Sequence, residues 1–314
     1  MDLSGRYVIQ DFIGEGSFGK VAKCLNLLNN ETVAIKIHKS HLSNADIHQE
    51  VDMLQQISTL DPDQNNLVEF IDAFDCENCY CLAFEMLDKS LWDLMKERHF
   101  QPLTLNEIRP ITQQVLKAFN ALKGLGIMHT DVKVDNIMLV NHQDQPFKVK
   151  LIDFGLALPV RKAKVGMTLQ APSFRAPEVF LGLPISEAID MWGLGCVIAF
   201  LYFGNYLFPG DASYEEMKAI CQMLGQPDAH LLNAGTKTSQ YFTKTGRFIN
   251  PRWRLRTNNS NANKDGSYYK SVAEWNSHSE KQHLWDISFA CTEGACFSMQ
   301  INGLTLNNLA KLII

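Results

Sequence analysis

Within the first 87 residues, several runs alternate apolar and polar side chains with a period of two, which is typical of half-buried β-strands. Between Tyr7 and about Ile37 the alternation is interrupted by a Gly-rich stretch and by an Asn-Asn pair, both of which favour turns. Residues 66–87 carry two more alternating runs. Between these regions a helical stripe consists of Ile47, Val51, Leu54 and Ile57. The pattern predicts a meander of antiparallel strands, a helix over residues 44–58, and two further strands.

The pattern changes to helical spacing after Leu87. Residues 104–126 open with a capping box formed by Thr104 and Glu107. Their apolar stripe consists of Ile108, Ile111, Val115, Phe119 and Leu122. A second long apolar helix is predicted over residues 186–203.

These patterns divide the chain into three parts and indicate an α+β fold. A small β-rich lobe with one main helix, residues 1–87, precedes a larger and mainly helical lobe, residues 88–256. Residues 257–314 contain an Asn-rich tract and one short apolar helical stripe. We therefore expect a poorly ordered tail, with the poorest order over residues 257–295.

Composition and net charge limit which kinds of binding partner and which cellular location we expect. Of the 314 residues, 46% are hydrophobic and 20% are charged, as in ordinary globular proteins. The net charge of −5 argues against nucleic acid or an anionic membrane as the main partner. No stretch reaches the ~18 consecutive apolar residues of a membrane-spanning helix, and the first ten residues lack the apolar core of a signal peptide. We therefore expect an intracellular protein with reduced cysteines.

Cys76, Cys79 and Cys81 are spaced closely enough to suggest a metal site. No second pair of ligands with suitable spacing follows them, and they interleave with apolar residues in a strand-like run. Buried or half-buried thiols are therefore favoured over a zinc site.

A Gly-x-Gly-x-x-Gly array is formed by Gly14, Gly16 and Gly19. Such an array also occurs in dinucleotide-binding proteins, but there it opens a helix and is followed by an acidic residue about 20 positions on. Here alternating strand-like residues follow it, so the array belongs to a hairpin whose backbone N–H groups can fold over phosphates. A Gly-rich hairpin without a ligand is the alternative.

The next strand places Lys36 beneath this hairpin. Because side chains alternate along a strand, Val33, Ile35 and Ile37 face a core while Ala34 and Lys36 face the other way. A small apolar residue beside a lysine suits a flat base and a phosphate. Glu50, on the following helix, is the leading candidate to hold the Lys36 ammonium. The alternative is that Lys36 is an ordinary solvated strand residue.

The stretch HTDVKVDN, residues 129–136, concentrates charge directly before an apolar run. Asp153 stands at the end of a later strand, so its carboxylate and Asn136 would supply the hard oxygen ligands that Mg²⁺ prefers. Asp131 would then accept a proton from a hydroxyl, and Lys133 would neutralise a phosphoryl group in transfer. A polar turn between buried elements is the alternative.

Six motifs occur in a fixed order along the chain: GEGSFGKV, VAIK, HQE, HTDVKVDN, DFG and APE. This ordered set resembles the eukaryotic protein kinases. Longer stretches, such as FRAPEVFLGLPISEAIDMWGLGCVIAFLYFGNYLFPG, are similar to the homeodomain-interacting protein kinases, which are relatives of the dual-specificity tyrosine-regulated kinases. The resemblance covers roughly residues 1–256 and implies a two-lobed protein kinase fold that transfers the γ-phosphoryl group of Mg-ATP to protein Ser and Thr hydroxyls.

The resemblance also implies a nucleotide site. Its residues would be Ile13, Gly14, Gly16, Gly19, Val21, Ala34, Lys36, Glu50, Glu85 and Leu87. The backbone of residues 85–87 would bind the adenine of ATP, and Phe84 would guard the pocket behind it. Lys36 would bind the α- and β-phosphates while pairing with Glu50.

The catalytic and metal roles follow from the resemblance in the same way. Asp131 would be the catalytic base and Lys133 would contact the γ-phosphate. Asn136 and Asp153 would hold Mg²⁺, and Asp190 would support the catalytic loop from below.

Some positions depart from the family pattern. Thr130 stands where protein kinases usually have an Arg before the catalytic Asp, and the homeodomain-interacting family has a non-Arg pattern there as well. The usual clamp for a phosphate on the activation segment, residues 156–178, is therefore missing. Thr168 stands where the family has an autophosphorylated Tyr, Ala171 where it has a small hydroxyl residue, and Pro172 where relatives have an Arg.

The late helices of the family's helical lobe have no recognisable counterpart after residue 256, so the resemblance implies an incomplete helical lobe and a divergent tail. In kinases Glu178 of APE pairs with an Arg in those helices. No Arg follows residue 256, so the Glu178 carboxylate must find another partner: a tail Lys, an earlier Arg or backbone N–H groups.

Two functions are therefore carried forward. The first is an active Ser/Thr protein kinase, favoured by the intact catalytic motifs. The second is a catalytically weak kinase-fold module that binds nucleotide or a protein partner, favoured by Ala171 and the divergent tail. By resemblance the substrates would be proteins, with transcription regulators among them, and the location would be the nucleus, with the cytoplasm as the alternative. No direct binding to nucleic acid or membrane is expected.

Overall fold

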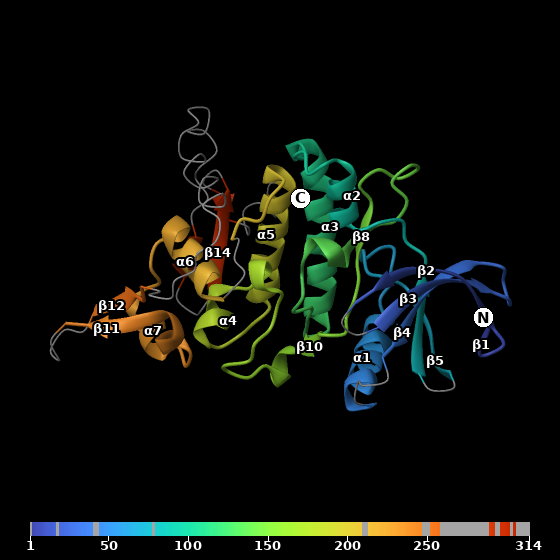
Figure 1. Ribbon diagram of the computed structural model, residues 1–314, viewed down its shortest axis with the longest axis horizontal. Coiled ribbons are helices and arrows are strands. Elements are labelled where there is room, and N and C mark those ends of the chain that lie inside the picture. The colour runs from blue at the N-terminus through green and yellow to red at the C-terminus, as the bar shows by residue number, and fades with distance from the viewer. Residues whose placement is uncertain are drawn as a thin grey trace.

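A computed structural model describes residues 2–16, 19–39, 44–76, 79–208, 213–246, 252–257, 289–292, 296–301 and 304–305. The antiparallel sheet lies at one end of the molecule and the helices that follow it in sequence lie toward the other end (Figure 1). This arrangement confirms the α+β prediction of a strand-rich part followed by a helical part.

The N-terminal sheet has the strand order β1-β2-β3-β4-β6-β5, and all neighbouring strands are antiparallel. Its strands are β1 (Asp2–Leu3), β2 (Tyr7–Glu15), β3 (Gly19–Asn26), β4 (Thr32–His38), β5 (Phe70–Cys76) and β6 (Cys79–Glu85). Helix α1 (Asn44–Ile57) crosses from β4 to β5, and its predicted apolar stripe is buried. The meander, the helix and the two later strands are therefore confirmed.

The two faces of β4 differ as the alternation predicts. Val33 and Ile35 are buried in an apolar cluster on one face of the sheet. Lys36 pairs in register with Val21 on β3, and Ala34 pairs with Phe84 on β6. Directly opposed residues share a face, so these four side chains lie on the other side of the sheet.

The second part of the chain is mainly helical. Its helices are α2 (Leu91–Glu97), α3 (Leu105–Gly124), α4 (Pro177–Leu181), α5 (Ala188–Phe203), α6 (Ser213–Leu224), α7 (Ala229–Ala234) and α8 (Thr238–Tyr241). Short strands join them: β7 (Ile127–Met128), β8 (Ile137–Leu139), β9 (Val149–Leu151), β10 (Leu158–Pro159), β11 (Phe242–Thr245) and β12 (Arg252–Leu255). Three 3₁₀ turns complete this part: η1 (Val134–Asn136), η2 (Val160–Lys162) and η3 (Pro172–Phe174).

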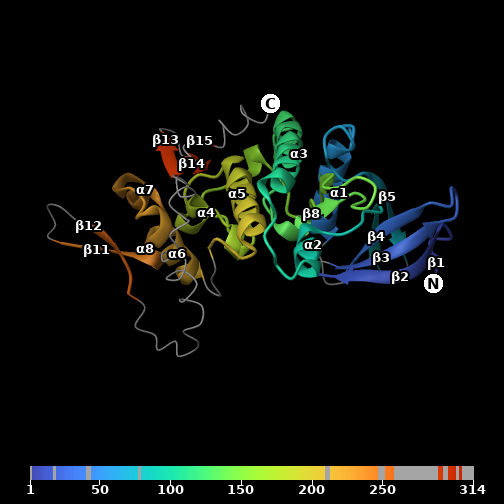
Figure 2. The ribbon, with the colours of Figure 1, turned by 90° about the horizontal axis from the view of Figure 1, so that it is seen from above.

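Helix α3 begins where the sequence predicts. Thr104 and Glu107 form the reciprocal capping box, with the Thr104 amide donating to the Glu107 carboxylate over 2.7 Å. Four members of the predicted stripe are buried, and Phe119 is partly buried against the same cluster. Helices α3 and α5 lie side by side in both views (Figure 2).

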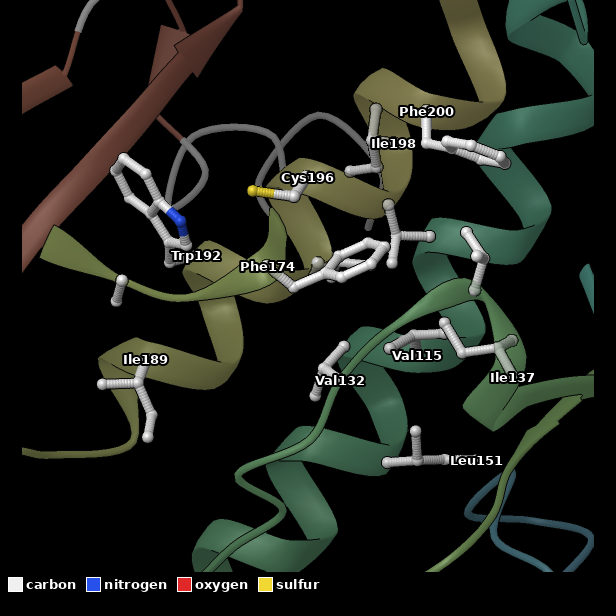
Figure 3. Close-up of a cluster of buried hydrophobic side chains, with 14 of the residues drawn as sticks. Val115, Val132, Ile137, Leu151, Phe174, Ile189, Trp192, Cys196, Ile198 and Phe200 are labelled. Atoms are coloured by element: carbon white, nitrogen blue, oxygen red, sulfur yellow. The ribbon is translucent and has the colours of Figure 1, made fainter. Parts of the chain in front are cut away.

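The main core lies between α3, α5 and the segments that carry the polar motifs. Figure 3 shows four members of this cluster: Val115 of α3, Val132 within the polar stretch 129–136, Ile137 of β8 and Phe200 of α5. Phe174, on the segment before α4, packs into it as well. The polar loop is therefore built on a packed apolar base, which restricts its backbone to one arrangement.

Little of the tail lies within the described residues. Strand β13 (Phe289–Thr292) pairs antiparallel with β14 (Cys296–Ile301), which pairs with β15 (Leu304–Thr305). Most of the range 257–295, where the sequence predicts poor order, falls outside the described residues. So does most of the short helical stripe at residues 302–314, of which Leu304–Thr305 forms strand β15 and not a helix. Within the range 257–295 the described strand β13 is regular structure.

Two carboxylates are buried on helices of the second part of the chain. Glu178 of α4 is 3% exposed, and its Oε2 has no hydrogen-bond partner among the described residues. Burial raises the pKa of Glu178 to about 7, although its own backbone amide lowers it in part. Glu216 of α6 is 1% exposed, and burial raises its pKa to about 7 against the opposing effect of Arg175. Of the partners considered for Glu178, only the backbone amide is found in the described part of the chain.

We predict that Glu178→Gln stabilises the protein above neutral pH. The unfolded carboxyl ionises near 4.5 and the folded one near 7, so the wild type loses stability as pH rises through this window. The amide removes that loss and should raise the free energy of unfolding at pH 8 by up to about 3 kcal/mol, with a smaller gain at pH 5.5. Urea denaturation at both pH values measures the difference.

The exposed Glu69 supplies the matched control, because Glu69→Gln should change the free energy of unfolding little at either pH. An equal effect of Glu178→Gln at pH 5.5 and pH 8 would contradict the assignment of a buried, titrating carboxyl.

Candidate active site

Three elements meet at the Lys36 ammonium. Its Nζ lies 2.6 Å from Oε1 of Glu50 on α1 and 2.9 Å from Oδ1 of Asp153, which follows β9. Lys36 and Glu50 are largely buried, with 13% and 5% of their side chains exposed. Burial alone would lower the pKa of Lys36, but Asp153 and Glu50 together raise it above its ordinary value, so the lysine is charged. The Lys36–Glu50 pair expected from the sequence is present.

His38 is an additional member of this cluster. Its Nε2 lies 3.5 Å from Oε2 of Glu50, and the side chain is buried. The sequence interpretation did not include it, although strand alternation places His38 on the same face as Lys36, two residues further along β4.

The candidate catalytic loop, residues 129–136, is hydrogen-bonded to α5 through Asp190. The two carboxylate oxygens of Asp190 accept the backbone amides of His129 over 2.7 Å and of Thr130 over 2.8 Å. Burial raises the pKa of Asp190, against the effects of His129 and of these two amides. The supporting role expected for Asp190 therefore has a direct geometric basis.

Asp131 is held at the centre of the loop. Its Oδ2 accepts the Asn136 amide over 2.9 Å and pairs with Nζ of Lys133 at 2.9 Å. Among the described residues both side-chain contacts use the same oxygen, which leaves Oδ1 for another group. Burial would lower the pKa of Lys133, but Asp131 raises it above its ordinary value, so the lysine is charged.

Asn136 and Asp153 can supply oxygen ligands for a cation. The Asn136 side-chain nitrogen donates to both the backbone oxygen and Oδ2 of Asp131, which leaves its Oδ1 as an acceptor. Burial would raise the pKa of Asp153, but Lys36 lowers it, so this carboxylate is ionised. No group of three or more His, Cys, Asp or Glu side chains suited to a metal ion occurs in the described part of the chain, the closely spaced cysteines included. A cation here would therefore need further oxygens from a ligand or from water.

The glycines of the hairpin between β2 and β3 have different roles. A Cβ on Gly19 would lie 2.3 Å from the backbone oxygen of Ile37, so this glycine is required by strand pairing. A Cβ on Gly14 would only touch Val21 at 3.9 Å, and one on Gly16 would meet nothing within 4 Å. Packing of the described residues therefore does not require Gly14 or Gly16, and their role over phosphates stays a prediction. The sequence interpretation had assigned all three glycines to this single purpose.

A buried lysine fixes the last residue of β6. Lys150 of β9 is 1% exposed, and its Nζ lies 2.6 Å from Oε1 of Glu85 and 2.8 Å from Oδ1 of Asp63. The same Glu85 oxygen accepts the Glu69 amide over 2.7 Å. Burial would lower the pKa of Lys150, but Asp63 and Glu85 raise it. The sequence interpretation missed Lys150, for which the signal was a lysine inside an otherwise buried strand.

The remaining nucleotide-site candidates occupy three places. Ile13 lies on β2, in an irregular part of its pairing with β3, and is 46% exposed. Leu87 is buried just beyond Glu85, and Phe84 packs against Phe70 with ring centroids 5.8 Å apart. These positions border the same sheet face as Lys36.

The activation segment is held by its own polar contacts. Arg175 donates to the backbone oxygens of Leu169 and Gln170 over 2.8 and 2.9 Å. Lys237, at the start of α8, donates to Oγ1 of Thr168 over 2.7 Å. A cation therefore contacts Thr168 despite the missing Arg before Asp131.

No helix within the described ranges is long and apolar enough to cross a membrane.

Comparison with known proteins agrees with the motif order. Residues 7–256 match the family described as protein kinase domain. The chain is 47% identical over 256 residues to homeodomain-interacting protein kinase 1 of Mus musculus, covering 81% of this chain and 21% of that protein. It is 42% identical over 277 residues to homeodomain-interacting protein kinase 1 of Caenorhabditis elegans, covering 87% of this chain and 32% of that protein.

A more distant relative is homeodomain-interacting protein kinase 4 of Mus musculus, 40% identical over 257 residues, with 80% of this chain and 41% of that protein covered. The chain thus spans between about a fifth and two fifths of the length of these relatives.

We predict that Lys150→Met destabilises the protein by roughly 2–3 kcal/mol, because it leaves the partly buried Glu85 carboxylate without its cation. Asp63→Asn should cost less than about 1 kcal/mol, since the Asp63 side chain is 71% exposed and water replaces the pair. Urea denaturation of both variants measures the free energies of unfolding. Equal losses in the two variants would show that the Lys150–Glu85 contact contributes nothing of its own.

Proposed function

The chain belongs to the protein kinase family, and we propose that it transfers the γ-phosphoryl group of ATP to serine and threonine hydroxyls of proteins. The observation that carries this proposal is the convergence of two charge clusters. One joins Lys36 to Glu50 and Asp153, and the other joins Asp131 to Lys133. Together they provide a phosphate-binding cation and a hydroxyl-facing base.

ATP would lie between the glycine hairpin and the sheet face of β3 and β4. Val21 and Ala34 offer apolar contact for the adenine, and backbone groups of residues 85–87 offer hydrogen bonds. The Lys36 ammonium, fixed by Glu50, would bind the α- and β-phosphates. Because Lys150 holds the Glu85 side chain, the adenine-binding backbone is fixed before nucleotide arrives.

Asn136 and Asp153 are the residues that would hold Mg²⁺. Oδ1 of Asn136 and the ionised Asp153 carboxylate are hard oxygen ligands, and both belong to segments anchored in the core. The ion would neutralise charge on the phosphate oxygens. Asp153 now contacts Lys36, so nucleotide and metal would compete with that contact.

Proton transfer falls to Asp131. As the substrate hydroxyl oxygen forms its bond to the γ-phosphorus and the bond to ADP breaks, the hydroxyl proton passes to Asp131. Contacts from Asn136 and Lys133 to Oδ2 orient the carboxylate so that Oδ1 can face the hydroxyl. Lys133 also places positive charge beside the phosphoryl group in transfer.

A second function, a catalytically weak module that binds nucleotide or a protein partner, is favoured by one observation. Ala171, directly before η3, has no hydroxyl to offer Asp131 or Lys133. We give it second place, because the Asp131–Lys133 contact forms without that hydroxyl.

Protein substrates follow from the proposed activity. The relatives' names refer to homeodomain proteins, and transcription regulators and the nucleus are proposed here on that basis.

We predict that Asp131→Asn lowers kcat for a generic basic protein substrate by roughly 10²-fold or more, because the base is lost. The dissociation constant for Mg-ATP should stay within about twofold, since Asp131 faces the hydroxyl rather than the nucleotide. Lys36→Met should instead weaken productive nucleotide binding and abolish transfer. Equal transfer by the wild type and Asp131→Asn would overturn the enzymatic function and leave the binding module.

We also predict that Thr168→Ala costs less than about threefold in kcat, since one exposed contact to Lys237 is lost. Lys237→Ala is the matched variant from the other side of this contact. A loss of tenfold or more in Thr168→Ala, about 1.4 kcal/mol in the barrier, would give Thr168 a direct role.

A further inference from the structure

Thr130 has an unusual backbone for its residue type. Its φ is 64°, in the left-handed region that a β-branched residue rarely adopts. The side chain is completely buried, directly before Asp131. Such a conformation persists only where the surroundings determine it, so the contacts of Thr130 are informative.

Thr130 is bonded on two sides. Its backbone amide donates to Oδ1 of Asp190 over 2.8 Å, which ties it to α5. Its hydroxyl donates to the backbone oxygen of Leu156 over 2.6 Å, across 26 residues of sequence. Leu156 directly follows Asp153, Phe154 and Gly155, so one residue links the helix beneath the loop to the start of the activation segment.

His129 makes a matching contact on the other side of the same motif. Its Nε2 lies 2.9 Å from the backbone oxygen of Ile152, and its ring meets that of Phe154 edge-on at 5.1 Å. His129 therefore fixes the residue before Asp153, and Thr130 fixes the residue after Gly155. Together they bracket the segment that carries the proposed metal ligand.

We infer that the Thr130 hydroxyl is a positioning group, which holds the start of the activation segment in register with the catalytic loop without any phosphate. This inference rests on the proposed kinase function. An Arg at this position would need an anionic partner on the segment, whereas the Thr hydroxyl needs only the Leu156 carbonyl. A neutral hydrogen bond of the unmodified chain thus ties the residue before Asp131 to the residue after Gly155.

The test compares Thr130→Val, which keeps the shape and removes the donor, with Thr130→Ser, which keeps the donor. Thr130→Val should lower kcat about tenfold, or about 1.4 kcal/mol, with the dissociation constant for Mg-ATP unchanged within about twofold. Thr130→Ser should retain most of the wild-type kcat. Phosphatase treatment of the wild-type protein should leave kcat unchanged.

Thr112 supplies the matched control. It is also a buried threonine that donates to a backbone oxygen, that of Ile108 over 3.0 Å, but it lies on α3 away from the site. Thr112→Val should leave kcat unchanged. Wild-type kcat in Thr130→Val, or equal losses in Thr130→Val and Thr112→Val, would overturn the positioning role.

Amide hydrogen exchange provides a readout that does not depend on activity. Loss of the Leu156 contact should speed exchange over residues 154–158 in Thr130→Val but not in Thr130→Ser. If the wild type transferred no phosphate, the proposed function would fail while this exchange pattern still decided whether the hydroxyl fixes the segment. Identical exchange in both variants would reject the inference.

Discussion

The charged cluster around Lys36 is the constraint on which the rest of this structure depends. A buried ammonium is tolerated only where carboxylates neutralise it, and here they come from α1 and from the segment after β9. The sheet, its helix and the helical lobe must therefore be placed together for the charge to be satisfied. The same placement exposes one face of β4 to the space beneath the glycine hairpin, which is where a nucleotide would bind.

Other buried charged groups differ in whether an opposite charge neutralises them. Lys150 forms ion pairs with Glu85 and Asp63. The pair with Glu85 ties β9 to residues 85–87, whose backbone would bind adenine. Glu216 has no hydrogen-bond partner for either carboxylate oxygen in the described part of the chain, and Glu178 has none for its Oε2; burial raises the pKa of each to about 7, although Arg175 lowers that of Glu216 in part. Paired charges thus lie where the site needs fixed geometry, and unpaired ones lie below the activation segment.

The catalytic loop takes its shape from long-range contacts, in addition to its own sequence. Asp190 holds the amides of His129 and Thr130, and these two residues in turn hold the backbone on either side of Asp153–Gly155. Asp131 and Asp153 are therefore positioned through a shared set of hydrogen bonds. A change in either segment is expected to reach the other through Thr130.

The sequence by itself determined the elements and the identity of the chemical groups. Periodicity fixed the strands around Lys36, the start of α3 at Thr104 and the buried stripe of α1, because these depend on local spacing. Motif order indicated the partners Lys36 and Glu50, which are only 14 positions apart. Only the tertiary structure decided that Lys150 reaches Glu85, that Gly19 serves strand pairing, and that Thr130 bonds Leu156. These contacts join segments whose approach is set by the packing of the whole core, and a local pattern carries no information about that approach.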